Sequence, residues 1–328
     1  MAGEGAERSP SRRMSAVFDI AVPAECDWPI TNCYIDVWTL ILAAWKLDPT
    51  AGLGVTVAQD YEGDQFTFFK YQHDDLELLY GVVVGELTIY ASLEEQVQQQ
   101  TRNGRLALVE ADGYYLPDTR ATSYRTQHTK TTIGIDTIDV AQGRLGYFHN
   151  VGHYDLGGED YAGIFRRLPH HAQVDDVLPP YVEFVKRRWP PLAGAALRDA
   201  VIGLLRRHLR RRPDANPIHV YRNDFARHMD WLLAHPQLFH EYAFGIFRQL
   251  GANYQLLAAH VDWLQARGVS DLVGVRAAAR TISATAKSMQ FKVARIAARG
   301  RFDPCTGMFD ALEQNYDAVI AGLNRALA

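Results

Sequence analysis

Thr31-Asn32-Cys33-Tyr34-Ile35-Asp36-Val37-Trp38 is the stretch in which an irregular segment becomes a helix. Before it, Asp27-Trp28-Pro29 predicts a loop, because proline lacks an amide donor and disfavours helical geometry in the residue that precedes it. After it, apolar residues recur at three- and four-residue steps until Asp48-Pro49. We therefore predict a buried helix that is capped by Asn32 and begins at Cys33.

Cys33 lies on the first turn of this predicted helix, and we interpret it as a nucleophile. The unpaired amides and the dipole at a helix start favour negative charge, and therefore favour the reactive thiolate over the thiol. The same amides can bind an oxyanion. The alternative is a buried structural residue, because cysteine is among the most buried residue types.

The composition is typical of a globular protein. The chain has 328 residues, of which 48% are hydrophobic and 22% charged, and its formal net charge is −4. Three cysteines, Cys26, Cys33 and Cys305, are too few for a disulfide framework or a cysteine-rich zinc site, which fits a reducing cytoplasm. No apolar run approaches the roughly 20 residues that cross a bilayer. We predict a cytoplasmic protein with no metal site and with neither nucleic acid nor membrane as a partner.

The pattern along the chain predicts an α+β protein in three parts. Residues 1–14 are rich in Gly, Ser, Arg and Glu and lack the apolar core of a signal peptide, so we expect a disordered leader. Residues 15–170 are expected to form a catalytic domain with an antiparallel sheet. Residues 171–328 are expected to form an all-helical domain that covers the cleft, because the helical period dominates there, with helices predicted over 192–209, 221–233, 237–250, 254–267, 275–299 and 308–327.

The first domain contains the residues that complete a site. Helices are predicted over 73–81 and 92–103, and strands over 105–112, 128–136 and 144–150, with a turn at 139–143. In an antiparallel pair the start of one strand lies beside the end of the next. His128 opens one strand and Asn150 ends its partner, so we expect them to be neighbours.

Cys33, His128 and Asn150 have the residue types of a cysteine-enzyme triad. Such an enzyme needs an imidazole that takes the thiol proton and a third group that fixes the imidazole ring. Their order along the chain is that of papain-like enzymes. The competing residues for the supporting roles are Asp136, Asp139, Asp155 and His149, and a competing base is His153.

Five segments also resemble a known bacterial family. Residues 31–38, 62–70, 109–119, 128–133 and 145–150 are similar to a bacterial family labelled as a domain of unknown function. More distantly, the Cys33 helix, the strand that ends at Asp112 with its Tyr-Tyr-Leu-Pro loop, and the His128 strand resemble the N-terminal domain of butirosin biosynthesis protein H. That domain is similar in plan to papain-like cysteine enzymes and acts as an acyltransferase.

The resemblance implies acyl or aminoacyl transfer through a Cys33 thioester, as in biosynthesis of natural products. The donor would be the phosphopantetheine thioester of an acyl or peptidyl carrier protein, no cofactor would be bound, and the acceptor would be an amine or a thiol. We expect Asn32, Asp112 and Tyr115 to bind the oxyanion or the substrate. Two departures stand out: the relatives more often have aspartate where this chain has Asn150, and papain-like enzymes have a glutamine where it has Asp27.

Other interpretations of the same residues stay open. Delivery of the acyl group to water would make the protein a thioesterase, peptidase or amidase, and a buried Cys33 would leave a non-catalytic module that binds carrier proteins. Five arginines between residues 206 and 212 fit either a docking site for a carrier protein or a solvated helix end whose cations complement the dipole.

Overall fold

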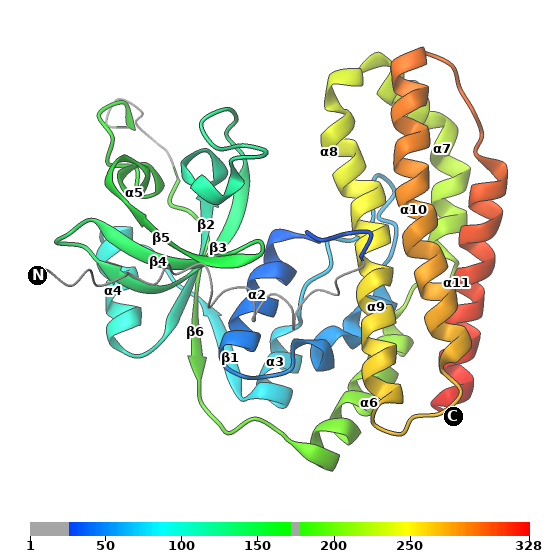
Figure 1. Cartoon of the computed structure of the whole chain (residues 1–328), viewed down its shortest axis with the longest axis horizontal. Coiled ribbons are helices and arrows are strands. Elements are labelled where there is room, and N and C mark those ends of the chain that lie inside the picture. Colours follow the sequence, from blue (N-terminus) through cyan, green and yellow to red (C-terminus); the bar gives the residue numbers. More distant parts are fainter. Residues whose placement is uncertain (1–25, 172–177) are drawn as a thin grey trace, which may run out of the picture. The chain divides into compact units, whose positions relative to one another are not determined.

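The computed structural model describes residues 26–171 and 178–328, so the predicted leader over residues 1–14 lies outside the described part. The chain divides into two compact units. Within the described residues, unit 1 comprises Asp36–Asp48 and 82–171 with 178–188, and unit 2 comprises 26–35, Pro49–Gly81 and Trp189–Ala328. Helix α2 (Cys33–Ala44) begins in unit 2 and continues in unit 1 (Figure 1).

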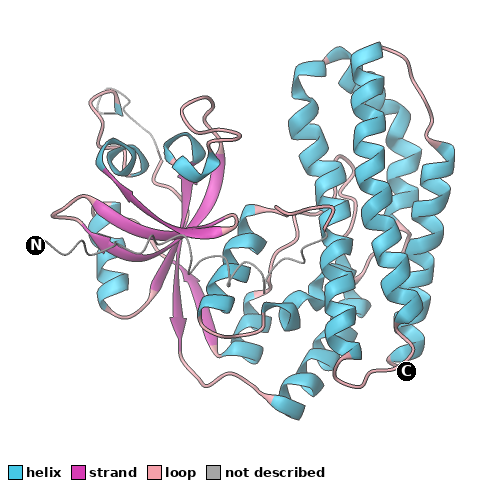
Figure 2. Ribbon diagram, viewed as in Figure 1, coloured by secondary structure: helices cyan, strands magenta, loops and turns pink. Residues whose placement is uncertain are grey.

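Unit 1 is built on an antiparallel sheet of six strands in the order β1-β6-β2-β3-β4-β5 (Figure 2). The strands are β1 (Val82–Glu86), β2 (Leu106–Asp112), β3 (Lys130–Asp139), β4 (Arg144–His149), β5 (Gly152–Gly157) and β6 (Val182–Arg187). The helical C-terminal part follows, which confirms the predicted α+β class at this level.

The two faces of the sheet are covered by different helices. Ile133 and Ile135 face a core that includes Val97 of α4 (Leu93–Arg102) and Ile164 of α5 (Gly158–Ile164). Gly134 lies between the two isoleucines and therefore points to the opposite face. There, a Cβ atom on Gly134 would lie 3.2 Å from Val37 and 3.0 Å from Ile41, so the missing side chain lets α2 pack closely on β3.

Several local predictions for unit 1 are confirmed. The predicted hairpin is β3 and β4, and the predicted strand over 105–112 is β2. Helix α4 has the expected cap, because the Ser92 hydroxyl accepts a hydrogen bond from the Glu95 amide. At the start of α2, the Ile35 amide donates to Asn32 Oδ1 over 3.0 Å, so Asn32 caps the helix as predicted.

Strands β1, β5 and β6 were not predicted. β6 lies beyond residue 170, the predicted end of the first domain, yet it lies between β1 and β2 in the sheet and pairs with both. It is a six-residue run that includes Glu183, Lys186 and Arg187, and it stands between Pro180 and Pro190. In such a short run with several charged residues, the apolar and polar alternation of a strand cannot be recognised. The run becomes a strand because it pairs with distant strands.

Unit 2 is helical. Its elements are the 3₁₀ helix η1 (Pro49–Ala58), α3 (His73–Tyr80), α6 (Gly194–Arg211), α7 (Pro217–Ala234), η5 (Pro236–Leu238), α8 (Phe239–Ala243), a π-helical turn η6 (Phe244–Arg248), α9 (Gln249–Gln265), α10 (Val273–Arg299) and α11 (Thr306–Ala326). The long helices α9, α10 and α11 pack side by side, with α7 against α11 (Figure 1). None of the helices in the described ranges has the length and apolarity to cross a bilayer.

A tryptophan and a glycine join the irregular N-terminal segment of unit 2 to its helices. The Trp28 amide donates to Gln255 Oε1 over 2.9 Å, and Gln255 Nε2 donates back to the Trp28 carbonyl over 3.0 Å. The Trp28 ring lies on Gly251 of α9, where an added Cβ would come within 2.4 Å of the indole nitrogen. Only glycine leaves room for the buried ring.

We predict that Gly251→Ala destabilises the protein by about 2 kcal/mol, because the added methyl group overpacks the Trp28 site. Gly203→Ala is the matched control. Gly203 is also helical, but nothing lies within 4 Å of its Cβ position, so alanine should stabilise α6 by about 0.5 kcal/mol or more. Denaturant unfolding of both variants measures the difference, and equal effects would contradict the packing argument.

Candidate functional site

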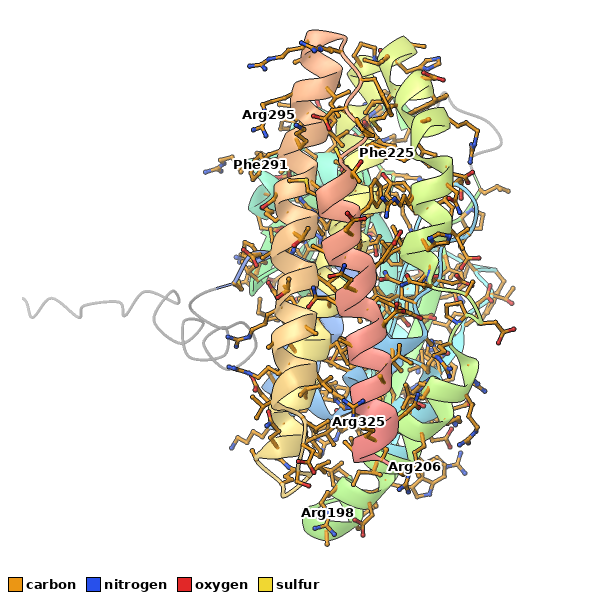
Figure 3. The ribbon with its side chains drawn as sticks, turned by 90° about the vertical axis from the view of Figure 1, so that its right-hand side faces the viewer. Arg198, Arg206, Phe225, Phe291, Arg295 and Arg325 are labelled. Carbon is orange, nitrogen blue, oxygen red and sulfur yellow. The ribbon has the colours of Figure 1, made fainter. Side chains whose placement is uncertain are left out.

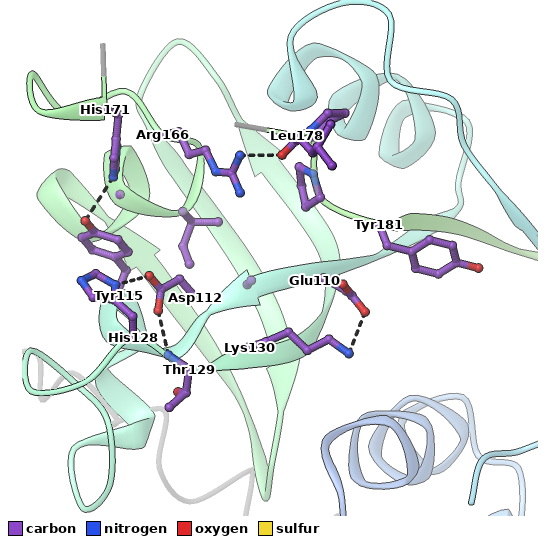
Figure 4. Close-up of a pocket in the computed structure, with 15 residues that line it drawn as sticks. Glu110, Asp112, Tyr115, His128, Thr129, Lys130, Arg166, His171, Leu178 and Tyr181 are labelled. Carbon is purple, nitrogen blue, oxygen red and sulfur yellow. Dashed lines mark hydrogen bonds and ion pairs between the residues drawn. The ribbon is translucent and has the colours of Figure 1, made fainter. Parts of the chain in front are cut away.

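A pocket of about 390 Å³ opens in unit 1 (Figure 4). It lies where β2 ends and β3 begins, and α5 and the segment before β6 complete its wall. Three residues that the sequence predicted for the site, Asp112, Tyr115 and His128, line it together. His171 and Arg166 line it as well, although the sequence analysis did not single them out.

His128 and Asp112 form an ion-pair geometry at the pocket. His128 Nδ1 lies 2.5 Å from Asp112 Oδ2. Because a carboxylate only accepts hydrogen bonds, Nδ1 carries the proton and donates it. The lone pair of neutral imidazole then lies on Nε2, and the His128 side chain is 69% exposed. This is the arrangement of a general base whose tautomer is fixed by a carboxylate.

Backbone geometry places the Asp112 carboxylate. In the β2–β3 ladder Asp112 lies opposite Lys130, so the end of one strand meets the residues that lead into the next. Asp112 Oδ1 accepts hydrogen bonds from the Tyr114 amide at 3.0 Å and the Thr129 amide at 3.2 Å. The first of these caps the 3₁₀ turn η2 (Gly113–Tyr115). Two amides therefore fix one carboxylate oxygen and leave the other for His128.

An aromatic ring fixes the His128 plane. The Tyr114 ring stacks on the imidazole with 4.4 Å between the centroids and an interplanar angle of 15°. The Arg125 guanidinium lies 5.6 Å from the Tyr114 centroid and pairs with Asp160 at 2.5 Å. Stacking and the ion pair restrain His128 in two directions, although its side chain is exposed.

Tyr115 connects the pocket to two further histidines. Its hydroxyl lies 3.2 Å from His170 Nε2 and 3.3 Å from His171 Nε2. One hydroxyl proton serves only one ring, so the other ring must donate to the Tyr115 oxygen. Burial, and then the Asp112 carboxylate, raise the pKa of Tyr115, while burial followed by the charge of His170 lowers the pKa of His171. Tyr115 is thus a protonated hydroxyl next to a neutral imidazole.

Two cations line the rest of the pocket. Lys130 pairs with Glu110 over 2.7 Å, and Arg166 donates to the Leu178 carbonyl over 2.6 Å (Figure 4). The Arg166 bond occupies a neutral acceptor, so the guanidinium charge is not cancelled by that contact. Among the described residues, no group of three or more His, Cys, Asp and Glu side chains has the geometry of a metal site.

Cys33 and Asn32 lie in unit 2, at the start of α2. Asn32 is buried, and its Nδ2 donates to the Phe69 carbonyl over 3.0 Å while its Oδ1 caps the helix. These bonds occupy both ends of the amide that the sequence analysis proposed for an oxyanion. Cys33 is partly exposed. Cys26 is also partly exposed, but burial and then Asp27 raise the pKa of its thiol.

Asn150 belongs to a second cluster in unit 1. Its Nδ2 donates to Asp118 Oδ2 over 3.2 Å. The same carboxylate accepts from His149 Nδ1 at 2.7 Å and from the Tyr147 hydroxyl at 2.7 Å, and Thr131 Oγ1 lies 2.7 Å from His149 Nε2. The His149 and Asp118 side chains are only 1% and 2% exposed. Since both nitrogens of His149 are occupied and buried, we interpret this cluster as structural.

His153 and Asp136 form a third histidine–carboxylate pair in unit 1. His153 Nε2 lies 2.9 Å from Asp136 Oδ1, and both side chains are about one third exposed. Asp136 and His153 lie close to Gly146, on the sheet face opposite the Ile133 and Ile135 core. Unlike His128, neither residue lines the unit-1 pocket.

The arginines of the 206–212 run differ in their hydrogen bonds. Arg206 donates to the Leu327 carbonyl, Arg207 pairs with Asp75 next to His208, and Arg212 donates to the Leu209 carbonyl. Arg210 and Arg211 are exposed. Arg206 and Arg207 therefore join α6 to distant segments of unit 2, and the Arg212 bond is local to the helix end, which favours the structural interpretation of these three arginines.

Asn150, which the sequence predicted as the neighbour of His128, bonds instead to Asp118, and the neighbour of His128 is Asp112. The sequence did contain a signal for the contact between Asp112 and His128. Asp112 ends the predicted strand before the His128 strand, and if the two strands pair antiparallel, the end of the first lies beside the start of the second. The contact of Tyr115 with His170 and His171 had no local signal, since these residues are more than 50 positions apart.

Comparison with known proteins identifies a family and no curated relative. Residues 21–187 match the model described as the DUF1839 N-terminal domain, and residues 194–325 match that of the DUF1839 C-terminal domain. No curated protein matches the chain.

The buried cluster leads to a prediction about stability. Burial by itself raises the pKa of Asp118, but hydrogen bonds from His149, Tyr147 and Asn150 outweigh it and hold the pKa below its usual value. Asp118→Asn should cost about 3 kcal/mol of unfolding free energy at pH 7, because it leaves His149 buried without its carboxylate. Asp112→Asn, at the exposed pair, should cost about 1 kcal/mol or less.

The loss of unfolding free energy caused by Asp118→Asn should decrease as the pH falls. A carboxyl whose pKa is lower in the folded state stabilises fully above its unfolded pKa, and the contribution is lost as pH falls through the folded value. The difference between wild type and Asp118→Asn should therefore shrink below about pH 4. Urea unfolding from pH 7 to pH 3 measures it, and a difference that grows on acidification would contradict the assignment.

Proposed function

The chain belongs to the DUF1839 family, and from that premise and the unit-1 pocket we propose that it is a cysteine-dependent acyltransferase. In this proposal an acyl or aminoacyl group moves from the phosphopantetheine thioester of a carrier protein to Cys33, and then to an amine or a thiol. His128 acts as the base, and Asp112 rather than Asn150 orients it.

The observation that carries the proposal is the His128–Asp112 pair. An imidazole with Nδ1 bound to a carboxylate, a ring fixed by stacking and an exposed Nε2 at a pocket is suited to moving protons. A purely structural histidine has both nitrogens bound in the interior, as in the His149 cluster of the same unit. The contrast favours a chemical role for His128.

The proposed transfer has two half-reactions, and His128 carries one proton in each. His128 Nε2 takes the proton of the Cys33 thiol, and the thiolate attacks the thioester carbonyl carbon. The bond from that carbon to the pantetheine sulfur breaks, and the departing thiolate receives the proton from His128. An acceptor amine then attacks the carbonyl carbon of the Cys33 thioester and loses a proton to His128. The bond from that carbon to the Cys33 sulfur breaks, and His128 returns the proton to the Cys33 thiolate. Amides at the start of α2 are suited to the oxyanion formed in each half-reaction.

The dimensions and charges of the pocket support a thioester donor. Its volume of about 390 Å³ lies within the range of small-molecule sites. Arg166 supplies positive charge for the phosphate of a phosphopantetheine arm, because its bond to the Leu178 carbonyl leaves the guanidinium charge in place, whereas the charge of Lys130 is paired with Glu110. Cys33 lies in unit 2 and His128 in unit 1, so the pairing of the two is the step that experiment must test.

We expect that incubation with candidate aminoacylated carrier proteins gives a covalent adduct, detected as a mass increase of the intact protein. Cys33→Ser should abolish the thioester adduct. Cys26→Ser is the matched control, because Cys26 is also partly exposed but its raised pKa disfavours the thiolate, so that variant should form the adduct at the wild-type level. An adduct that persists in Cys33→Ser and disappears in Cys26→Ser would overturn the nucleophile assignment.

The base is tested by comparing two exposed histidine–carboxylate pairs. His128→Ala and Asp112→Asn should each slow adduct formation at least about a hundredfold, the usual size of a general-base contribution. His153→Ala removes a similar imidazole from the Asp136 pair and should leave the rate within a few-fold of wild type. Rates come from the mass spectra over time. Loss with His153→Ala but not with His128→Ala would make His153 the base.

The acceptor distinguishes a transferase from a hydrolase. If water consumed the Cys33 adduct as fast without an amine or thiol as with it, the protein would be a thioesterase with the same site. We expect the adduct to decay slowly in buffer and rapidly when the correct acceptor is added.

A further inference from the structure

Helix α10 is strongly basic in a chain whose net charge is −4. Its 27 residues contain no Asp or Glu. They contain six cations, which are Arg276, Arg280, Lys287, Lys292, Arg295 and Arg299. Neighbouring carboxylates can neutralise such charge, and cations without a carboxylate neighbour can bind an acidic partner.

Neighbouring carboxylates neutralise only some of these cations. Arg276 and Arg280 both reach Asp262 of α9, and Lys292 pairs with Asp303. Within residues 26–171 and 178–328, no ion pair involves Arg295 or Arg299. The C-terminal half of α10 therefore carries the uncompensated charge.

Arg295 and Arg299 share one ridge with an exposed aromatic ring and with Lys287, whose ammonium lies 4.2 Å from the centroid of the Trp28 ring. Lys287, Phe291, Arg295 and Arg299 follow one another at four-residue steps, so their side chains form a row along the helix. Phe291 is 55% exposed, and the Lys287 ammonium lies 5.9 Å from its ring centroid. Figure 3 shows Phe291 and Arg295 pointing outward from α10. We call these four residues the α10 ridge.

Helix electrostatics explains only part of the ridge. Cations in the last turn complement the helix dipole, which accounts for Arg299. Arg295 lies one turn earlier, where the dipole effect has faded, and an exposed phenylalanine gains nothing from the dipole. An exposed apolar ring followed by two arginines that form no ion pair within the described residues is instead suited to a partner that buries the ring and supplies carboxylates.

We propose that the α10 ridge docks an acidic helix of a partner protein, with an apolar side chain of that helix on Phe291 and carboxylates on Arg295 and Arg299. The acidic charge follows from complementarity with the ridge. A bilayer would need a broader apolar face, and nucleic acid a wider basic footprint than one row. The identity of the partner rests on the proposed function, in which the acyl donor is a carrier protein.

The experiment compares one acyl group on two donors, the carrier protein and free pantetheine. Both give the Cys33 adduct, but only the carrier protein has a surface to dock. For the double variant Arg295→Glu/Arg299→Glu we expect adduct formation from subsaturating carrier protein to fall roughly tenfold or more, through KM. Phe291→Ala should weaken it in the same way. With the pantetheine thioester, both variants should react at the wild-type rate.

Arg210→Glu/Arg211→Glu is the matched control. It makes the same charge change at two exposed arginines of α6 that are not part of the ridge. It should leave the carrier-protein reaction within a few-fold of wild type. Equal loss with both donors, no loss for the ridge variants, or an equal loss in the control would overturn the docking assignment.

Direct binding separates this inference from the proposed function. Anisotropy of a fluorescently labelled carrier protein measures its Kd without any chemistry. If no adduct forms in wild type, the acyltransfer proposal fails, but salt-sensitive binding that the ridge variant weakens would still support docking. Binding that is absent, or equal in wild type and the ridge variant, would overturn it. Binding of anionic vesicles or duplex DNA in place of the carrier protein would overturn the choice of partner.

Discussion

The pairing of β2 with β3 is the constraint on which the site in unit 1 depends. Because Asp112 lies opposite Lys130, the last carboxylate of one strand meets the segment that leads into the next. Two amides then hold one oxygen of Asp112 and leave the other 2.5 Å from His128. A shift of one residue in this register would turn Asp112 to the other face of the sheet and leave His128 without its carboxylate.

Unit 1 shows how burial separates three similar histidine–carboxylate pairs. His149 and Asp118 are sealed, and every hydrogen-bonding nitrogen of the ring has a partner, so the pair stabilises the β3–β4 region. The pairs of His128 and His153 keep part of the imidazole exposed. Of these two, only His128 lines the pocket. The chemistry of the side chains is the same in each case, and exposure determines whether the ring can exchange protons with a substrate.

Unit 2 combines tight packing inside with charge outside. Gly251 makes room for Trp28, and arginines of the 206–212 run bind carbonyls and Asp75 within the unit. On α10, Arg295 and Arg299 form no ion pair among the described residues, and Phe291 is exposed one turn before Arg295. Adjacent arginines of α6 thus differ in their contacts, whereas residues spaced by four along α10 lie in one row.

The amino-acid sequence by itself determined the local elements: the Asn32-capped helix that begins at Cys33, the β3–β4 hairpin, the Ser92 cap and helices α6, α7, α10 and α11, because period and capping chemistry act within a few residues. The predicted helices over 237–250 and 254–267 were wrong in their division, since the chain there forms η5, α8, the π-helical turn η6 and an α9 that runs through the expected break. It also singled out His128, Asp112 and Tyr115, which line one pocket of unit 1. Only the tertiary structure decided that β6 enters the sheet, that Asp112 rather than Asn150 binds His128, and that Tyr115 meets His170 and His171. These outcomes depend on pairing between segments that are distant in the sequence. The register of that pairing sets where each side chain points, and a local sequence pattern does not determine the register.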